Sequence, residues 1–355
     1  MNILFNISHP AHVHFFKNTI RILSQKGHGI TTVARNKDIT LQLLDAYDIR
    51  HFVLTTKGKG IVGLVKELIE QQFKLLKIIK KNKIDIMLQI GGIFNAPVGK
   101  LLGIPTLAFS DTEHDKWSNR ISFPLSKHVF SPTCFNHTIG GYWKNQIHYP
   151  GYHELAYLSP HYTSNEQRNK NIFLVRFVGW GAGHDIGKTG LSRKQKIELI
   201  NLLSKFGSVH ISSESPLPEE FSKFTCRIDP SQIHSFMATC KMIVGESPTM
   251  VSEAACLGIP AVLISNFNLG YSSEQDKKYN LIKHFKLNQW HEIIDQITNW
   301  ACSEINDVWQ QKRYNMLESK IDVTAWLVDL IENYPESIIK ARKGLFEKYR
   351  IKYLI

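Results

Sequence analysis

The fold is decided by residues 243–264, which read IVGESPTMVSEAACLGIPAVLI. An apolar run leads into a loop of small residues, and the loop opens a short alanine-rich segment that stops at Gly258. Ser247 can cap a helix and Pro248 suits its first turn, while glycine is the usual left-handed residue at a helix end. Pro260 then starts a second apolar run. The pattern predicts a strand, a tight loop, a helix, a turn and a strand.

The start of this expected helix is a candidate anion site. The first N–H groups of a helix are free, and together with the helix dipole they favour phosphate. Glu253 lies one turn into the helix, where an acidic residue can accept hydrogen bonds from a ribose, as in dinucleotide-binding folds. The alternative is an ordinary strand-helix-strand unit that binds no ligand.

Strands and helices alternate along the chain in two sets. This rhythm is typical of Rossmann-like domains with parallel sheets and right-handed crossovers. The first set predicts an N-terminal domain at 1–155, and a polar, turn-rich segment at 151–170 predicts a linker. The second set predicts a C-terminal domain at 171–335. A basic amphipathic tail is expected at 336–355.

Composition limits the class of protein. A chain of 355 residues with 43% hydrophobic and 21% charged residues is long enough for two globular domains. No apolar run approaches the roughly 18 residues that span a bilayer, and the N-terminus enters a strand and not a secretory signal. The five cysteines are scattered without CxxC spacing, which argues for a reducing compartment and against zinc. We therefore expect a cytoplasmic protein, soluble or peripheral.

The net charge of +12 calls for an anionic partner. Nucleic acid is not expected, because the chain carries no helix-turn-helix, RNP or zinc-finger signature. Phosphorylated substrates and an anionic membrane surface remain as candidate partners. In the tail, lysines and arginines alternate with apolar residues, so it can lie on the inner face of the cell membrane. The alternative is a terminal helix folded back on the N-terminal domain.

Three histidines follow the first expected strand: His9, His12 and His14. In a doubly wound domain the end of that strand faces the ligand crevice. An imidazole there can act as acid or base near neutral pH. Two other interpretations are open, a zinc site and a helix cap. Zinc is disfavoured because no convincing carboxylate or thiol partner is adjacent, so no metal is expected.

Charged residues follow other expected strands. Asp111 and Glu113 come after the strand at 104–109, where a carboxylate can deprotonate an acceptor hydroxyl, although a solvated loop is the plain alternative. In the second domain, Arg176 precedes the glycine-rich stretch 179–185 and can pair with a diphosphate. Ser213 and Glu214 end the following strand and are expected to line the same crevice.

The run from 228 to 264 resembles the donor-nucleotide half of the GT-B glycosyltransferases. It is especially similar to the peptidoglycan N-acetylglucosaminyltransferase and to UDP-N-acetylglucosamine 2-epimerases, in which this pattern holds the diphosphate and ribose of a UDP-sugar. The resemblance carries over to Ser247, Pro248, Thr249, Met250 and Glu253. Glu246-Ser247-Pro248 departs from the usual Ser-Gly-Gly type of loop.

Two N-terminal motifs support the same resemblance. The stretch Ala11-His12-Val13-His14-Phe15 resembles the Gly-His-Val-x-Pro turn of these glycosyltransferases, and His12 matches the family histidine. The 2-epimerases carry His-x-Glu-Ala-Gly-x-Arg where this chain has Asp-Thr-Glu-His-Asp, so only Glu113 is kept. From ISHPAHVHFFKNTI through FSDTEHD and LVRF to the opening motif, the chain is identified as a member of the domain of unknown function 354 family.

The resemblance implies an α/β, GT-B-like protein with two Rossmann-like domains whose parallel sheets face a central cleft. The implied function is metal-independent transfer of a sugar from a UDP-linked nucleotide-sugar to a cell-surface polysaccharide or lipid-linked acceptor. No cofactor is implied, because the nucleotide-sugar is the donor substrate. The alternatives are a UDP-N-acetylhexosamine 2-epimerase, a UDP-sugar hydrolase, and a non-catalytic protein that binds nucleotide-sugars.

Overall fold

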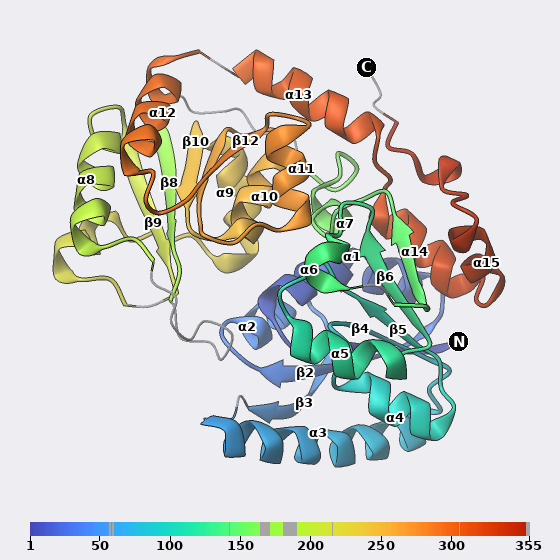
Figure 1. The fold of residues 1–355 in the computed structure, drawn as a ribbon. Coiled ribbons are helices and arrows are strands. Elements are labelled where there is room, and N and C mark those ends of the chain that lie inside the picture. Colours follow the sequence, from blue (N-terminus) through green and yellow to red (C-terminus); the bar gives the residue numbers. More distant parts are fainter. Residues whose placement is uncertain are drawn as a thin grey trace. The chain divides into compact units, whose positions relative to one another are not determined.

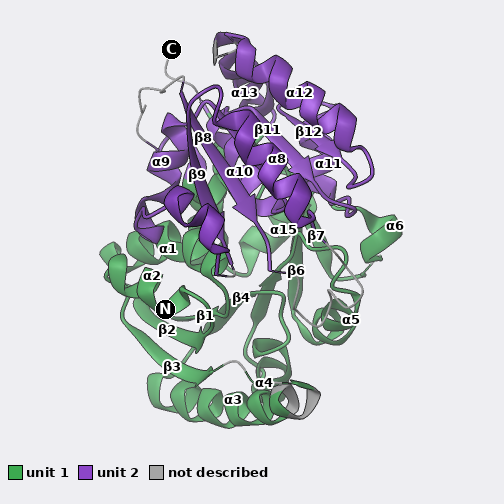
Figure 2. Cartoon of the chain, turned by 90° about the vertical axis from the view of Figure 1, so that its left-hand side faces the viewer, with its two compact units in different colours: residues 1–157, 320–351 green, residues 158–319, 352–355 purple. Residues whose placement is uncertain are grey.

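The computed structural model divides the chain into two compact units (Figures 1 and 2). Unit 1 comprises residues 1–157 and 320–351, and unit 2 comprises residues 158–319 and the end of the chain from Lys352. The structure describes residues 1–56, 58, 60–141, 143–163, 171–179, 190–214, 216–304 and 306–352.

Unit 1 is built on a seven-stranded parallel sheet in the order β3-β2-β1-β4-β5-β6-β7. The strands are β1 (Asn2–Ile7), β2 (Gly29–Asn36), β3 (His51–Thr56), β4 (Ile86–Ile90), β5 (Thr106–Phe109), β6 (His128–Pro132) and β7 (Gln146–Tyr149). In the interior strand β1, Leu4 pairs with Thr31 on one side and Met87 on the other. Leu4 is completely buried, as expected for a parallel strand covered on both faces.

Helices connect the strands of unit 1 (Figure 1). They are α1 (Pro10–Gln25), α2 (Thr40–Ala46), α3 (Gly60–Asn82), α4 (Asn95–Leu102), α5 (Lys116–Leu125), α6 (His137–Gly140) and α7 (Leu155–Leu158), which reaches the unit boundary. The chain later adds α14 (Val323–Glu332), α15 (Glu336–Arg342) and the 3-10 turn η3 (Glu347–Tyr349).

Unit 2 has a five-stranded parallel sheet in the order β12-β11-β10-β8-β9. The strands are β8 (Ile172–Phe177), β9 (Ser208–Ser213), β10 (Met242–Gly245), β11 (Ala261–Ile264) and β12 (Ile282–Phe285). The helices are α8 (Arg193–Leu203), η1 (Glu219–Phe224), η2 (Pro230–Gln232), α9 (Ile233–Thr239), α10 (Pro248–Leu257), α11 (Gly270–Lys277), α12 (Trp290–Cys302) and α13 (Asn306–Glu318).

The elements predicted for residues 243–264 are confirmed as β10, α10 and β11. Ser247 is the N-cap of α10, and its hydroxyl accepts a hydrogen bond from the N–H of Met250 at 3.4 Å. Gly258 ends the helix with a left-handed φ of 70°. The local sequence signals therefore determine this part of the fold.

The C-terminal helices lie in unit 1, where the sequence predicted a second domain extending to residue 335. The boundary is at Ser319, because α14 packs against α1 and inserts Trp326 into the core of unit 1. The buried Trp326 ring lies 4.7 Å from the Tyr149 ring and 5.6 Å from the Phe130 ring, measured between centroids. This contact between residues distant in sequence corrects the expected boundary.

The expected basic tail at 336–355 is also part of unit 1 as far as residue 351. Ile338, Ala341 and Phe346 are buried, whereas Ile339 and Leu345 on the same segment are exposed. The segment is therefore a packed terminal helix and not a separate tail, which corresponds to the alternative interpretation of the sequence. Among the described residues, no helix is both long and apolar enough to cross a membrane.

Candidate active site

The strand order of unit 2 reverses between β8 and β10, since the chain continues from β8 to β9 on one side and from β10 to β11 on the other. In open parallel sheets, ligands bind beyond the carboxyl ends of the strands at such a reversal. Arg176 lies near the end of β8, and Glu246 and Ser247 follow β10. The predicted donor residues therefore cluster where the topology favours a ligand.

The start of α10 is built for an anion. Ser247 caps the helix, and Pro248 occupies the first turn without needing a hydrogen bond. A helix start of this kind presents N–H groups and the positive end of the dipole. Thr249 and Met250 belong to this turn. Gly245, just before it, allows close approach to β8, because a Cβ there would lie 2.5 Å from the carbonyl oxygen of Arg176.

Glu246 has a different role from a phosphate ligand. Its side chain is only 1% exposed, and its carboxylate accepts hydrogen bonds from the N–H groups of Leu191 at 2.6 Å and Val178 at 3.2 Å. These two residues flank the stretch 179–190, most of which, including predicted loop residues 180–185, lies outside the described residues. The carboxylate thus holds together the two ends of that connection. This role explains why Glu246 occupies the position at which the resembling loops of the Ser-Gly-Gly type have a small residue.

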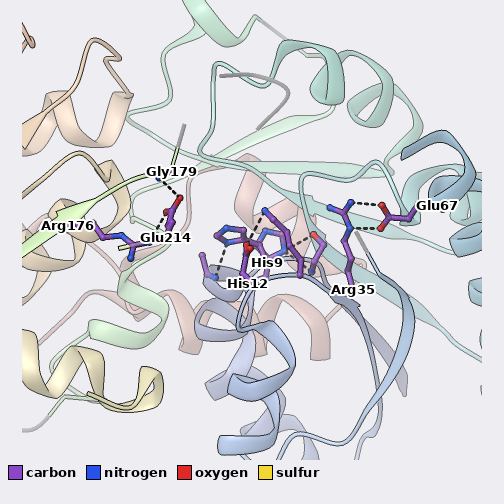
Figure 3. A network of polar contacts seen from close by, with 11 residues as sticks. His9, His12, Arg35, Glu67, Arg176, Gly179 and Glu214 are labelled. Carbon is purple, nitrogen blue, oxygen red and sulfur yellow. Dashed lines mark hydrogen bonds and ion pairs between the residues drawn. The ribbon is translucent and has the colours of Figure 1, made fainter. Parts of the chain in front are cut away.

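Arg176 is paired within unit 2 (Figure 3). Its guanidinium donates to the Ser212 hydroxyl at 2.8 Å and to the Glu214 carboxylate at 2.7 Å. The other oxygen of Glu214 accepts from the N–H of Gly179 at 3.2 Å. The Nε of Arg176 is buried and makes no hydrogen bond to any described residue. The structure therefore brings Arg176 and Glu214 together, next to Ser213 at the end of β9, whereas pairing of Arg176 with a diphosphate stays a prediction.

Glu253 lies inside α10 and is nearly buried. One of its carboxylate oxygens is 3.0 Å from Nε2 of His234, a residue of α9. The sequence suggested a ribose as the partner of Glu253, whereas the structure gives this carboxylate a partner within the protein. Ribose binding by Glu253 stays a prediction, and it would require the carboxylate to serve both groups.

In unit 1, the three histidines after β1 do not lie together. His9 caps α1, with its Nδ1 accepting from the N–H of Ala11 at 3.2 Å, and its ring centroid is 5.9 Å from that of His12 (Figure 3). His14 is two residues beyond His12 and so lies on the opposite side of the helix. Its ring is buried at 5.3 Å from the Tyr157 ring and 5.9 Å from the Tyr47 ring. His14 is thus a packing residue of the helix.

His12 is held as a neutral imidazole. Burial lowers its pKa well below the ordinary value, and repulsion from His9, His153 and Lys37, whenever these groups are protonated, lowers it further. Nδ1 of His12 accepts a hydrogen bond from the N–H of Ser8 at 3.4 Å. A neutral imidazole in this orientation carries its proton on Nε2, from which it can donate a hydrogen bond or a proton.

Asp111 pairs with a histidine that the sequence did not single out. Its carboxylate is 3.1 Å from Nδ1 of His153. Burial acts to raise the pKa of Asp111, but attraction to His153 and the hydrogen bond between the two groups outweigh it, so the pKa is lowered. His153 follows β7, in the stretch assigned from sequence to a linker. The sequence feature that could have drawn attention to His153 is its place between Gly151 and Glu154, since a histidine beside a glycine and a carboxylate is a common arrangement at a site.

Glu113 makes a hydrogen bond to another part of unit 1. It is almost completely buried, and its carboxylate accepts from the N–H of Asn136 at 2.9 Å, at the start of α6. Asp115 caps α5 by accepting from the N–H of Ser118. Within the parts of the chain that the structure describes, no group of three or more His, Cys, Asp or Glu side chains could hold a metal ion.

A family model described as "Protein of unknown function (DUF354)" matches residues 1–176. This match confirms the resemblance to that family over about half of the chain. The chain is also 22% identical to the UDP-N-acetylglucosamine–N-acetylmuramyl-(pentapeptide) pyrophosphoryl-undecaprenol N-acetylglucosamine transferase of Staphylococcus epidermidis, with 95% of this chain and 94% of that protein covered.

Solved structures of two kinds of enzyme share the fold. The UDP-GlcNAc 2-epimerase of Neisseria meningitidis, bound to UDP-GlcNAc, matches with a TM-score of 0.62 and 13% identity, covering 96% of this chain and all of that one. MurG of Acinetobacter baumannii matches with a TM-score of 0.54 and 15% identity, covering 94% and 99%. The predicted GT-B-like α/β class is confirmed, and the chain is related to glycosyltransferases and UDP-GlcNAc 2-epimerases.

Proposed function

We propose that this protein is a GT-B glycosyltransferase that moves a sugar from a UDP-linked donor to a polysaccharide or lipid-linked acceptor of the cell surface. The observation that carries the proposal is the capped start of α10 at the strand-order reversal of unit 2. It is supported by the match of nearly the whole chain to a transferase whose name specifies UDP-N-acetylglucosamine and a pyrophosphoryl-undecaprenol acceptor.

In the proposed reaction, unit 2 holds the donor. The diphosphate gains negative charge as it leaves the sugar, and the N–H group of Thr249 and the positive end of the helix dipole stabilise that charge. The N–H of Met250, which bonds the Ser247 hydroxyl, would have to serve both groups. Arg176 contributes a guanidinium whose Nε makes no hydrogen bond to any described residue. Ser213 and Glu214 line the same strand ends. The nucleotide-sugar is a substrate, and no further cofactor is needed.

Unit 1 provides the acid-base groups of the proposed reaction. His12 and Asp111 lie at the carboxyl ends of β1 and β5, on the edge of a parallel sheet where catalytic groups gather. Glu113 stays a candidate by family position, although its carboxylate also fixes the start of α6. The proposed mechanism uses these side chains and no metal ion, so EDTA should leave the rate unchanged.

A UDP-N-acetylhexosamine 2-epimerase or hydrolase is the second candidate. Such an enzyme needs the same donor site and acid-base groups but no acceptor, and the neutral His12 beside other titratable groups would suit it equally. A non-catalytic nucleotide-sugar-binding protein would need the donor site alone. The acid-base groups of unit 1 would then have no catalytic task.

The deciding experiment measures UDP release and sugar isomerisation during incubation with UDP-N-acetylhexosamine, first alone and then with lipid-linked acceptors. A transferase is nearly idle without acceptor and releases UDP when acceptor is added. Epimerised donor, or free sugar and UDP formed without acceptor, would overturn the proposal in favour of an epimerase or a hydrolase. A thermal-shift screen of nucleotide-sugars beforehand would identify the base and the sugar.

We place the proposed enzyme in the cytoplasm, on the inner face of the cell membrane. The net charge of +12 would attract it to anionic lipid. Sedimentation with anionic and neutral vesicles tests this location, since binding should require the anionic lipid and weaken as salt increases. Equal recovery with both vesicles would contradict it.

A further inference from the structure

The pair formed by His153 and Asp111 has a geometry that His12 lacks. Asp111 follows β5 and His153 follows β7, so both side chains come from the carboxyl edge of the sheet of unit 1. A carboxylate only accepts hydrogen bonds, so Nδ1 of His153, at 3.1 Å, must carry the proton. In the neutral imidazole, Nε2 then has the free lone pair.

His12 is the opposite tautomer. A backbone N–H can only donate, so Nδ1 of His12, which faces the N–H of Ser8, carries no proton. The proton of the neutral ring is therefore on Nε2, which can donate a hydrogen bond but cannot accept a proton. Of the two imidazoles, only His153 is oriented as a base, in the way that a carboxylate orients the histidine of a hydrolase triad.

Two polar atoms around this pair are buried without a hydrogen bond to any described residue. They are Nε2 of His153, a residue that is 8% exposed as a whole, and the hydroxyl of Tyr149, which is completely buried. A buried polar group without a partner is costly, and native proteins keep few of them. Two such atoms around one carboxylate indicate a place where a substrate hydroxyl can bond.

The surroundings of His153 come from three elements. His12 approaches from α1, and Phe15, one turn later, packs its ring with a centroid 4.6 Å from that of His153. Tyr149 comes from β7, and its pKa is raised by burial and by the charges of Asp111, Cys134 and Glu154. The tyrosine is therefore a neutral hydrogen-bond donor at neutral pH, and Asp111 is the anion that faces the imidazole.

We propose that His153 is the catalytic base of unit 1 and that Asp111 is its positioning residue. This inference rests on the proposed glycosyl transfer. In that step, the oxygen of an acceptor hydroxyl forms a bond to the anomeric carbon of the donor. The bond from that carbon to the diphosphate breaks, and its electron pair leaves with UDP. The hydroxyl proton passes to Nε2 of His153 and is later released to water.

The test combines kinetics with an NMR measurement of the ring protons. His153→Asn should lower kcat about 10²–10⁴-fold, the usual contribution of a positioned base. The affinity for UDP should be unchanged, because the proposed donor site belongs to unit 2. His128→Asn is the matched control, since His128 is a partly buried histidine at the amino end of β6, the opposite edge of the same sheet. Its kcat should stay within about 3-fold of wild type.

Long-range ¹H–¹⁵N spectra report which ring nitrogen carries the proton. The inference expects Nδ1–H for His153 and Nε2–H for His12 in the wild type, and a shift toward Nε2–H for His153 in Asp111→Asn with a loss of kcat. Nε2–H on His153 in the wild type would overturn the inference whatever the activity. A normal kcat in His153→Asn would also overturn it. A wild type that turns over no nucleotide-sugar would overturn the proposed function, and the spectra alone would then decide whether Asp111 orients His153.

Discussion

The two sheets end in different kinds of polar group. At the strand-order reversal of unit 2, the carboxylates are already paired: Glu214 with Arg176, Glu253 with His234, and Glu246 with two backbone N–H groups. The Nε of Arg176 is the atom there that makes no hydrogen bond to any described residue, and it belongs to a cation that can meet a phosphate. At the carboxyl edge of unit 1, by contrast, Nε2 of His153 and the Tyr149 hydroxyl are buried without a hydrogen bond to any described residue. Paired groups make a rigid binding scaffold, whereas unsatisfied groups are kept where chemistry is done. The contrast suggests that unit 2 binds and unit 1 reacts.

The largest expected effect is a loss of turnover on substitution of His12, which should separate reaction in unit 1 from donor binding in unit 2. His12→Asn should lower turnover about 10²–10⁴-fold, as removal of a positioned acid-base or hydrogen-bonding group does. Donor affinity, measured by calorimetry with UDP, should change little because unit 2 is intact. EDTA should not inhibit the wild type. Inhibition by the chelator that zinc or manganese reverses would instead favour a metal site at the histidines.

Glu246 is expected to be the residue of unit 2 with the greatest effect on stability. Glu246→Ala leaves the buried N–H of Leu191 and the partly buried N–H of Val178 without their acceptor, which should cost about 2–4 kcal/mol of unfolding free energy. Urea denaturation measures this loss. Glu214→Ala is the control, because this carboxylate is half-exposed, and losing its bonds to Arg176 and to the N–H of Gly179 should cost less than about 1 kcal/mol. Equal losses in both variants would show that Glu246 does not hold the connection.

Local signals explain which parts of the fold could be predicted. The cap at Ser247, the proline after it and the glycine at 258 lie within one short stretch, and each acts on its own backbone. The strands β7 and β12 were missed because each is a four-residue edge strand with polar residues, such as His148 and Lys283. Missing β7 also concealed His153, because the chain around it then resembled a linker.

Contacts between distant residues explain the rest. Nothing near residue 326 in the sequence shows that its tryptophan packs on Phe130 and Tyr149, so the return of the chain to unit 1 was not predictable from local patterns. The same holds for Glu253, whose partner His234 is on another helix. Sequence reasoning found the residue types at the strand ends, but it could not tell which of them already satisfy one another.

Substitution of Glu253 tests whether a carboxylate of unit 2 that already contacts a protein group also binds UDP. Glu253→Ala should weaken UDP binding by roughly 1.5–3 kcal/mol, the contribution of one charge-assisted hydrogen bond. Because the carboxylate also contacts His234, some loss of stability should accompany it. His234→Ala should lower stability without a comparable loss of affinity. Unchanged affinity in Glu253→Ala would remove this residue from the site and leave it with a structural role only.

The smallest effect is the pH dependence of stability in unit 1. The pKa of His12 is lowered below its ordinary value of 6.5 in the folded protein. As pH falls below about 6.5, the unfolded chain takes up a proton that folded His12 does not, so the unfolding free energy should decrease. His12→Asn should flatten this part of the curve, measured by urea denaturation between pH 7 and pH 5. An identical slope in both proteins would mean that the imidazole is not held neutral.

The central claim, that unit 2 holds the diphosphate of a nucleotide, is tested most directly by calorimetric titration of the wild type and of Arg176→Met with UDP and with uridine. UDP should bind at least about 100-fold more tightly than uridine, because only UDP has phosphates to meet the start of α10. The difference should shrink about 10-fold or more in Arg176→Met, through weaker UDP binding alone. Equal affinities for UDP and uridine in the wild type would contradict the account.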